Sequence, residues 1–352
     1  MTLATLLLDL ERCNSTLSEL QSSFDACGCG VTPCQSRPEA NYDYGLHVGA
    51  LFIVLAVSCL GATTPILLKY GSAWARNSFN VRYAVACGKL VGTGIVLACG
   101  LIHMLQPASQ SLSSPCVPWE FNTDYQAYAF LYSLLAIIVM HFAETLLRLH
   151  LTAGLDSSQN RTGDSASPEE VAKPPLAPHT DLHVPHDYAQ RHVTQSYVME
   201  LALTVHSVFI GLTVGVVGYN ELVALLTAMC FHQFFEGIAL GSRLADAEFG
   251  KLSSAIFILI FAMSAPTGIA CGIAYTSLIN PGGITYLLVE GTFDGICSGL
   301  LLYVGLQLLL IDFPNEIDEY CRRSHDKIRR LLGLFASLWV GAGFMAYIGK
   351  YL

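Results

Sequence analysis

The chain has few charged residues for its length. Asp, Glu, Lys and Arg make up 13% of its 352 residues, against about 25% in ordinary soluble domains. Hydrophobic residues make up 53%. This deficit of charge excludes an ordinary soluble fold and points to lipid as the surrounding solvent. Lys and Arg together number only 18 and form no clustered basic face, so nucleic-acid binding is not expected.

Several motifs are also missing. No Gly-x-x-x-x-Gly-Lys loop occurs, which argues against ATP-driven pumping, and no His-Glu-x-x-His motif occurs, which argues against an intramembrane metalloenzyme. We therefore predict that the protein is not an enzyme. A secretory signal is not indicated either, because Asp9 and Glu11 interrupt the first apolar run. Residues 1–44 are predicted to be an extracytosolic tail whose disulfide pairing stays open; its cysteines are Cys13, Cys27, Cys29 and Cys34.

Eight apolar runs are long enough to cross a bilayer, which takes roughly 20 residues per helix. They lie near 46–69, 84–107, 126–150, 196–218, 221–244, 252–275, 285–312 and 331–352. The sequence thus predicts an all-α membrane protein, with helices one to three in 45–150 and helices four to eight in 196–352. The polar stretch 151–195 is predicted to be a disordered cytosolic linker. Its His183 and His186 either hold a metal loosely or belong to a solvated segment.

The basic residues predict the orientation. Fifteen of the 18 Lys and Arg lie in the odd-numbered connections or at their edges, and the even-numbered connections contain none. Because cytosolic loops are enriched in Lys and Arg, both termini are predicted to lie outside the cytosol. The fifteen are Lys69, Arg76, Arg82, Lys89, Arg148, Arg161, Lys173, Arg191, Arg243, Lys251, Arg322, Arg323, Lys327, Arg329 and Arg330.

A possible metal site lies in the fourth and fifth runs. His232 and Glu236 are four residues apart and share one helical face. His206 lies about ten residues into the fourth run and His232 about eleven into the fifth, so both fall near 15 Å depth at about 1.5 Å per residue. Imidazole and carboxylate together suit Zn(II), Fe(II) or Mn(II). The alternative is a buried hydrogen-bonded trio that only stabilises the bundle.

Other ionisable residues inside the predicted membrane region are candidates for a transport pathway, because such groups are expensive in lipid. They can equally serve as interhelical hydrogen-bond partners. They are His103, Glu200, Glu290 and Asp294.

The strings HSVFIGLTVG (206–215), FHQFFEGIALG (231–241) and GTGIVLACGLIHML (92–105), with the eight spans and the histidine-containing linker, resemble the ZIP family of zinc–iron permeases, in its plant and fungal branch. The resemblance implies that helices 1–3 and 6–8 form an inverted repeat around helices 4 and 5. It implies a metal site at His206, His232 and Glu236, with His103 near the entrance. Transport of divalent metal into the cytosol and a homodimer are further implications.

The sequence departs from the two-metal pattern of some family members. Ser207, Ile210 and Gln233 stand where those members carry Asn, Glu and Asp. We therefore predict one central metal, with Gln233 and Ser207 as weak or outer ligands. The predicted function is a zinc or iron permease, working by alternating access, in the plasma membrane. A membrane metal sensor that does not transport is the alternative.

Overall fold

The computed structural model describes residues 42–70, 77–163, 184–247, 249–276, 283–322 and 326–350. All regular secondary structure in this part of the chain is helical, and eight helical segments are long and apolar enough to cross a membrane. This confirms the predicted all-α class and the predicted eight spans. The elements are α2 (Tyr44–Tyr70), α4 (Phe79–Ala98), η1 (Cys99–Leu105), α5 (Gln106–Leu112), η2 (Glu120–Asp124), α6 (Tyr128–Gly163), α7 (Val184–Val216), α8 (Tyr219–Asp246), α9 (Lys251–Tyr275), α10 (Ile284–Gln307), η3 (Leu308–Asp312), α11 (Phe313–Tyr320) and α12 (Lys327–Ile348).

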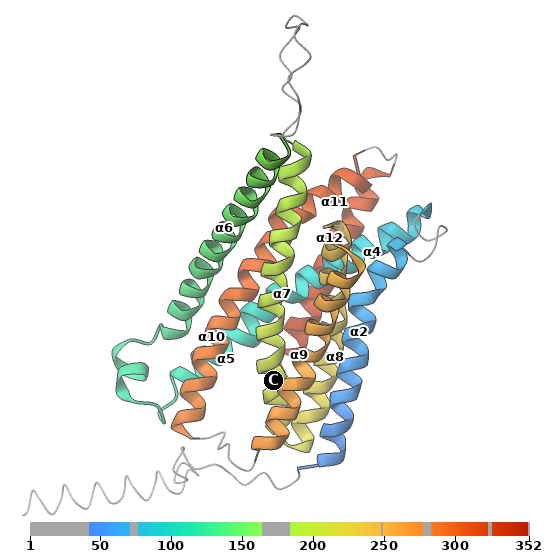
Figure 1. Cartoon of the computed structure of the whole chain (residues 1–352). Helices are drawn as coiled ribbons and strands as arrows, with labels where there is room; N and C mark the ends of the chain where they lie inside the picture. The colour runs from blue at the N-terminus through green and yellow to red at the C-terminus, as the bar shows by residue number, and fades with distance from the viewer. Residues whose placement is uncertain are drawn as a thin grey trace, which may run out of the picture.

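The helices on either side of the predicted linker are longer than the apolar runs. Helix α6 continues to Gly163 and α7 already begins at Val184, so both ends of the 151–195 stretch are helical. The reason is physical: an apolar run marks only the length of helix that needs lipid, whereas a helix can continue through polar residues in water. The two helices approach each other at the top of Figure 1.

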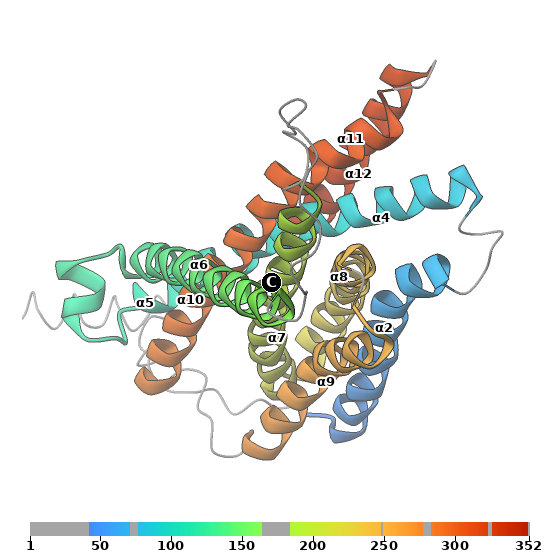
Figure 2. The ribbon, with the colours of Figure 1, turned by 45° about the horizontal axis from the view of Figure 1, so that its top comes forward.

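The spans pack in a regular set of pairs. Helix α2 packs on α8, α9 on α7, α4 on α12, and α10 on α6. Helices α4 and α10 also contact α8 and α7, respectively, and α2 contacts α9. Figures 1 and 2 show α2, α8 and α9 gathered on one side of α7 and α6 with α10 on the other. Helix α7 therefore contacts helices of both groups, α9 and α8 on one side and α10 and α6 on the other.

Two of these pairs depend on glycine. Gly211 and Gly215 of α7 face Gly268 and Gly272 of α9, and a Cβ atom on any of them would collide with backbone atoms of the other helix. Gly61 of α2 is held against α8 in the same way. Small residues at this spacing let helix backbones approach closely in a membrane. The structure thus brings the glycine pairs of α7 and α9 into one interface.

The substitution Gly268→Ala is expected to destabilise the protein by about 1–3 kcal/mol, because the new methyl group would strike the carbonyl oxygen of Val208. Thermal unfolding of the detergent-purified protein measures the effect. The control is Gly343→Ala, since nothing lies within 4 Å of a Cβ atom there. Equal melting temperatures for the two variants would show that close packing at α7–α9 does not limit stability.

The second and seventh spans are built alike. In each, an α-helix passes into a short π-helix, η1 or η3, and then into another α-helix. Each following helix has a proline in its first turn, Pro107 in α5 and Pro314 in α11. Proline lacks the N–H that a regular helix needs, and π-turns frequently lie at functional sites. Both spans therefore contain an irregular turn that changes the direction in which the following side chains point.

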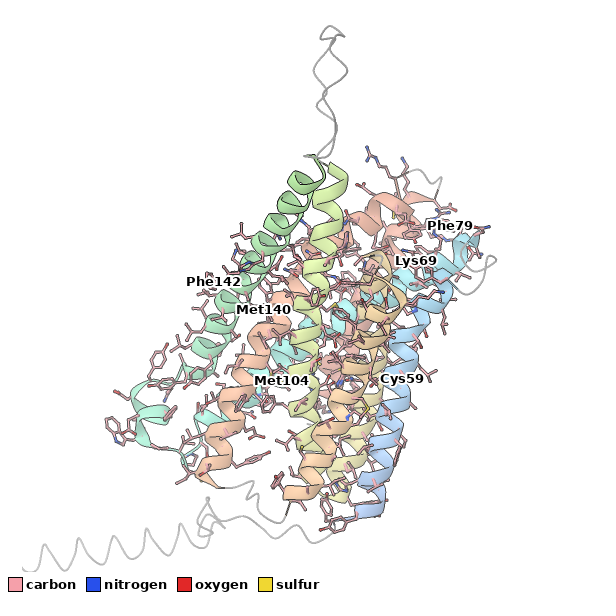
Figure 3. All side chains as sticks on the ribbon, in the orientation of Figure 1. Cys59, Lys69, Phe79, Met104, Met140 and Phe142 are labelled. Atoms are coloured by element: carbon pink, nitrogen blue, oxygen red, sulfur yellow. The ribbon has the colours of Figure 1, made fainter. Side chains whose placement is uncertain are left out.

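The outward faces of the bundle are apolar. Phe142 of α6 points away from the other helices, whereas Met140 of the same helix and Met104 of η1 lie inside (Figure 3). Large exposed apolar side chains also cover α2 and α12, among them Phe52 and Trp339. Exposed apolar faces of this size suit contact with lipid chains rather than water. The protein is accordingly a multi-pass membrane protein.

Candidate metal centre

Three of the predicted site residues are buried between α7 and α8. His206 of α7 and Glu236 of α8 have no exposed surface, and His232 of α8 is 1% exposed. The rings of His206 and His232 lie 6.0 Å apart between centroids. The turn between the helices is short, because α7 ends at Val216 and α8 begins at Tyr219. The two helices are therefore antiparallel neighbours that present these side chains to each other.

A third helix contributes a cysteine that the sequence interpretation did not include. Cys99, the first residue of η1, offers its sulfur within 4.8 Å of ligand atoms of both His206 and Glu236. All three side chains are fully buried. Nitrogen, oxygen and sulfur donors at this spacing can hold a metal ion. In the sequence, Cys99 is a cysteine within an apolar run, and no spacing relates it to His206 or Glu236.

The donor atoms of this group lack protein partners. Both ring nitrogens of His206 and both carboxylate oxygens of Glu236 are buried without a hydrogen bond among the described residues. Buried polar atoms of this kind are costly and are almost always satisfied in folded proteins. A bound cation would satisfy several of them at once. No hydrogen bond joins these three side chains to one another among the described residues.

Ser207 and Gln233 face each other beside this group. The Gln233 side-chain amide donates to the Ser207 hydroxyl oxygen at 3.4 Å, and both residues are fully buried. Their polar atoms are thus engaged with each other, next to His206 and His232 in the chain. Ser207 and Gln233 are thus neutral groups at the edge of the centre.

Two predicted pathway residues line a cavity of about 590 Å³ between α7 and α10. Glu290 accepts hydrogen bonds from Ser111 at 2.9 Å and from Tyr286 at 3.0 Å. Asp294 lies one turn further along α10 and also lines the cavity. Across from them, Thr213 of α7 is seven residues from His206, about 10 Å along the helix. The cavity therefore lies beside the centre, toward the end of α7.

The other two pathway candidates have protein partners. His103 is buried in η1, and its Nε2 lies 2.8 Å from the carbonyl oxygen of Met345 in α12. Glu200 of α7 is buried, and Thr204 donates to it at 3.3 Å. Neither residue belongs to the group around Cys99. Among the predicted linker ligands, His183 lies outside the described residues and His186 falls in the first turn of α7.

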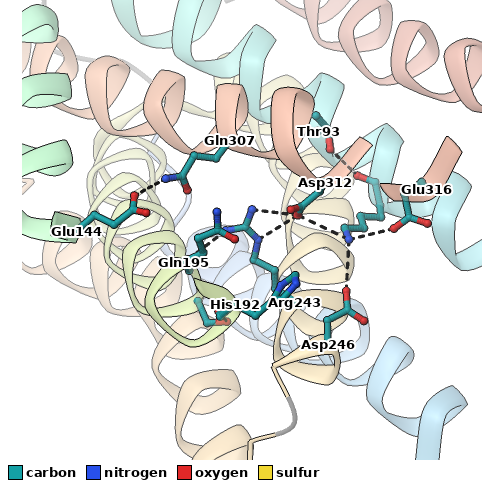
Figure 4. A network of polar contacts seen from close by, with 11 residues as sticks. Thr93, Glu144, His192, Gln195, Arg243, Asp246, Gln307, Asp312 and Glu316 are labelled. Atoms are coloured by element: carbon teal, nitrogen blue, oxygen red, sulfur yellow. Dashed lines mark hydrogen bonds and ion pairs between the residues drawn. The ribbon is translucent and has the colours of Figure 1, made fainter. Parts of the chain in front are cut away.

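A network of buried ion pairs joins residues of α4, α8, η3 and α11 (Figure 4). Along α7, the network and the cavity near Thr213 lie on opposite sides of the centre. Arg243 of α8 is fully buried and donates through Nε and Nη2 to Asp312 Oδ2, at 3.2 and 3.0 Å. Lys89 of α4 contacts Glu316, Asp246 and Asp312 at 3.1, 3.4 and 3.7 Å. The sequence interpretation counted Lys89 and Arg243 with the odd-numbered connections, although they fall near the ends of the runs 84–107 and 221–244. In the structure both lie within helices, because carboxylates from η3, α8 and α11 compensate their charge.

Cysteines divide into two groups. Cys116, in the connection after α5, is disulfide-bonded. The other cysteines of the described residues are free; they are Cys59, Cys87, Cys99, Cys230, Cys271, Cys297 and Cys321. Cys99 is thus available as a thiol ligand.

The chain is similar to known proteins over most of its length. The family described as ZIP Zinc transporter matches residues 44–349. Zinc transporter 8 of Oryza sativa subsp. japonica is 27% identical over 92% of this chain and 92% of its own length. Fe(2+) transport protein 1 of the same organism is 28% identical over 94% and 92%. Zinc-regulated transporter 1 of Candida albicans is 27% identical over 77% of this chain and 54% of its own length.

Proposed function

Because the chain belongs to the ZIP zinc transporter family, we propose that it carries divalent transition metal, zinc or iron, across the membrane into the cytosol. The observation that carries the proposal is the buried group of Cys99, His206 and Glu236 with His232 beside it. Imidazole, carboxylate and thiolate donors suit Zn(II) and Fe(II) better than Mg(II) or Ca(II), which take mostly oxygen. The names of the plant relatives, zinc and Fe(2+) transporters, agree with this range.

We propose that the metal moves by alternating access around this one centre. The packing pairs support a 3+2+3 arrangement with an inverted repeat. Exchanging α2 with α9, α4 with α10, α6 with α12 and α7 with α8 turns the principal helix pairs named above into one another. The π-turn and the following proline in both the second and the seventh span agree with the same exchange. Two similar halves can then rock around a centre held by α7 and α8.

The proposed orientation places both termini outside the cytosol. Besides the distribution of Lys and Arg, the disulfide at Cys116 supports it, since disulfides persist on the oxidising side of a membrane. Cys116 follows the second span and so lies on the proposed outer side. Location in the plasma membrane and assembly into a homodimer stay predictions from the sequence.

Radiometal uptake tests the proposal. Full-length protein in liposomes is expected to take up zinc, with iron(II) and manganese(II) competing to different extents, and His232→Ala is expected to abolish uptake. If wild type binds metal but moves none, the protein is a sensor, the alternative function predicted from sequence. Liposomes loaded with ATP and liposomes without it should give equal rates.

Removing the cysteine sulfur is expected to weaken metal binding. Cys99→Ala should raise the KM for zinc about tenfold, which corresponds to roughly 1.4 kcal/mol, while Cys99→Ser should raise it less because a hydroxyl retains some donor capacity. Cys230→Ala is the matched control, since Cys230 is a half-buried free thiol outside the ligand group. An unchanged KM in Cys99→Ala would remove the thiol from the centre.

A further inference from the structure

The ion-pair network lies on the same helix faces as the metal centre. Glu236 and Arg243 of α8 are seven residues apart, two helical turns and about 10 Å. His206 and Gln195 of α7 are eleven residues apart, close to three full turns, and Arg243 Nη1 donates to the Gln195 carbonyl at 3.2 Å. Lys89 belongs to α4, and α4 leads directly into η1, whose first residue is Cys99. A metal that leaves the centre along these faces toward the C-terminal end of α8 meets the network next.

A cavity of about 370 Å³ opens beside the network. Lys89, Ser242, Asp246, Asp312 and Glu316 all line it. Asp246 is about half exposed, whereas Asp312 is 3% exposed. The cavity therefore connects the buried end of the network with the surface, on the proposed cytosolic side.

Two buried oxygen atoms in the cavity wall have no partner among the described residues. They are the Ser242 hydroxyl oxygen and the Asp312 Oδ1 atom, on side chains that are 6% and 3% exposed. Asp312 uses only Oδ2 for Arg243 and Lys89. A carboxylate with one free oxygen beside a free hydroxyl is a natural oxygen-donor pair for a cation.

The charges of the network fit an exchange of cations. Lys89 and Arg243 with Asp246, Asp312 and Glu316 leave one net negative charge in a largely buried space. Replacing the Lys89 ammonium by a divalent ion would bring the same group to neutrality, whereas adding the ion beside the ammonium would leave it positive. The cavity gives the lysine side chain room to withdraw.

We propose that Asp246, Asp312, Glu316 and Ser242 form a second, transient site for a divalent transition-metal ion, and that Lys89 is a tethered cation that occupies it between transport events. The ion displaces the ammonium on its way out, and the ammonium returns when the ion leaves. Oxygen donors alone hold zinc more weakly than a Cys, His and Glu set does, so the ion is released rather than trapped. This inference rests on the proposed function, which supplies the direction of transport.

Counting bound zinc by equilibrium dialysis of the purified full-length protein tests the site directly. At a free zinc concentration that just saturates wild type, Lys89→Gln is expected to bind one more ion per chain, because the competing ammonium is gone. The double variant Lys89→Gln/Asp312→Asn should return to the wild-type number. Lys69→Gln is the matched control: Lys69 lines the same cavity but contacts the carbonyl oxygen of Ala245 rather than a carboxylate. Equal numbers in Lys89→Gln and wild type would overturn the site.

Asp246→Asn keeps the test decisive if Lys89→Gln does not fold, because the half-exposed Asp246 tolerates substitution. Its maximal zinc uptake rate is expected to fall at least threefold with an unchanged KM, since release and not central binding is affected. An unchanged rate would identify the network as a purely structural set of ion pairs. A wild-type protein that moves no metal would refute the proposed function, while the dialysis counts would still decide whether the second site exists.

Discussion

Glu236→Gln is expected to lower zinc uptake at least about 100-fold, which corresponds to about 2.7 kcal/mol. Glutamine has nearly the shape of glutamate, so packing around this fully buried side chain is kept. What is lost is the carboxylate charge, which together with the Cys99 thiolate offsets a divalent ion beside two neutral imidazoles. A buried divalent cation without that offset is strongly disfavoured. Uptake of radioactive zinc into liposomes at matched protein content measures the effect.

The control for this substitution is Glu221→Gln in the same helix. Glu221 lies in the first turn of α8 and is exposed, so its loss should leave uptake within about twofold of wild type. Melting temperatures of both variants close to that of wild type would exclude unfolding as the cause. Uptake by Glu236→Gln within threefold of wild type would contradict the assignment of this carboxylate to the metal centre.

Arg243→Met is expected to destabilise the protein by about 3–5 kcal/mol, the usual effect of removing one partner of a buried ion pair. Arg243 is fully buried and makes two hydrogen bonds to Asp312. Without it, the buried Asp312 carboxylate keeps the more distant Lys89 ammonium, at 3.7 Å, as its remaining ion-pair partner among the described residues. Thermal unfolding in detergent, together with the amount of monodisperse protein recovered, measures the loss.

A double variant separates the charge from the packing. Arg243→Met/Asp312→Leu removes both charges and should recover most of the lost stability, because well-packed apolar side chains can replace a buried ion pair. Arg82→Met is the surface control, since the Arg82–Glu319 pair is about half exposed on both sides and should contribute less than about 1 kcal/mol. A double variant as unstable as Arg243→Met alone would mean that the guanidinium acts through its contact with Gln195 instead.

Much of the fold could be predicted because lipid imposes simple rules on sequence. A span needs a long apolar run, and the eight runs correspond to the eight spans of the structure. The lengths of α6 and α7 could not be predicted in this way, since their extensions lie in polar sequence. The ion pairs of Lys89 and Arg243 could not be predicted for a related reason: a charged residue near the end of an apolar run looks the same whether it faces water or a buried carboxylate on another helix.

The arrangement of the candidate centre could be predicted only where its residues are close in sequence or matched in depth. His232 and Glu236 share a face by their spacing, and the short turn brings His206 opposite them. Cys99 comes from a distant span, and its position depends on the wider turn of η1, which no periodicity reveals. A free cysteine in an apolar run is usually core packing. Only tertiary structure distinguishes that case from a ligand.

The π-turns affect which changes in chain length the protein tolerates. A π-turn contains one residue more than the α-turn it replaces. Deleting one residue within η1 can therefore be absorbed by conversion to regular α-helix, with α4 undisturbed. The same deletion between His232 and Glu236 would rotate one of them by about 100° around the helix axis. Length variation in this bundle should accordingly collect in the second and seventh spans and avoid the fourth and fifth.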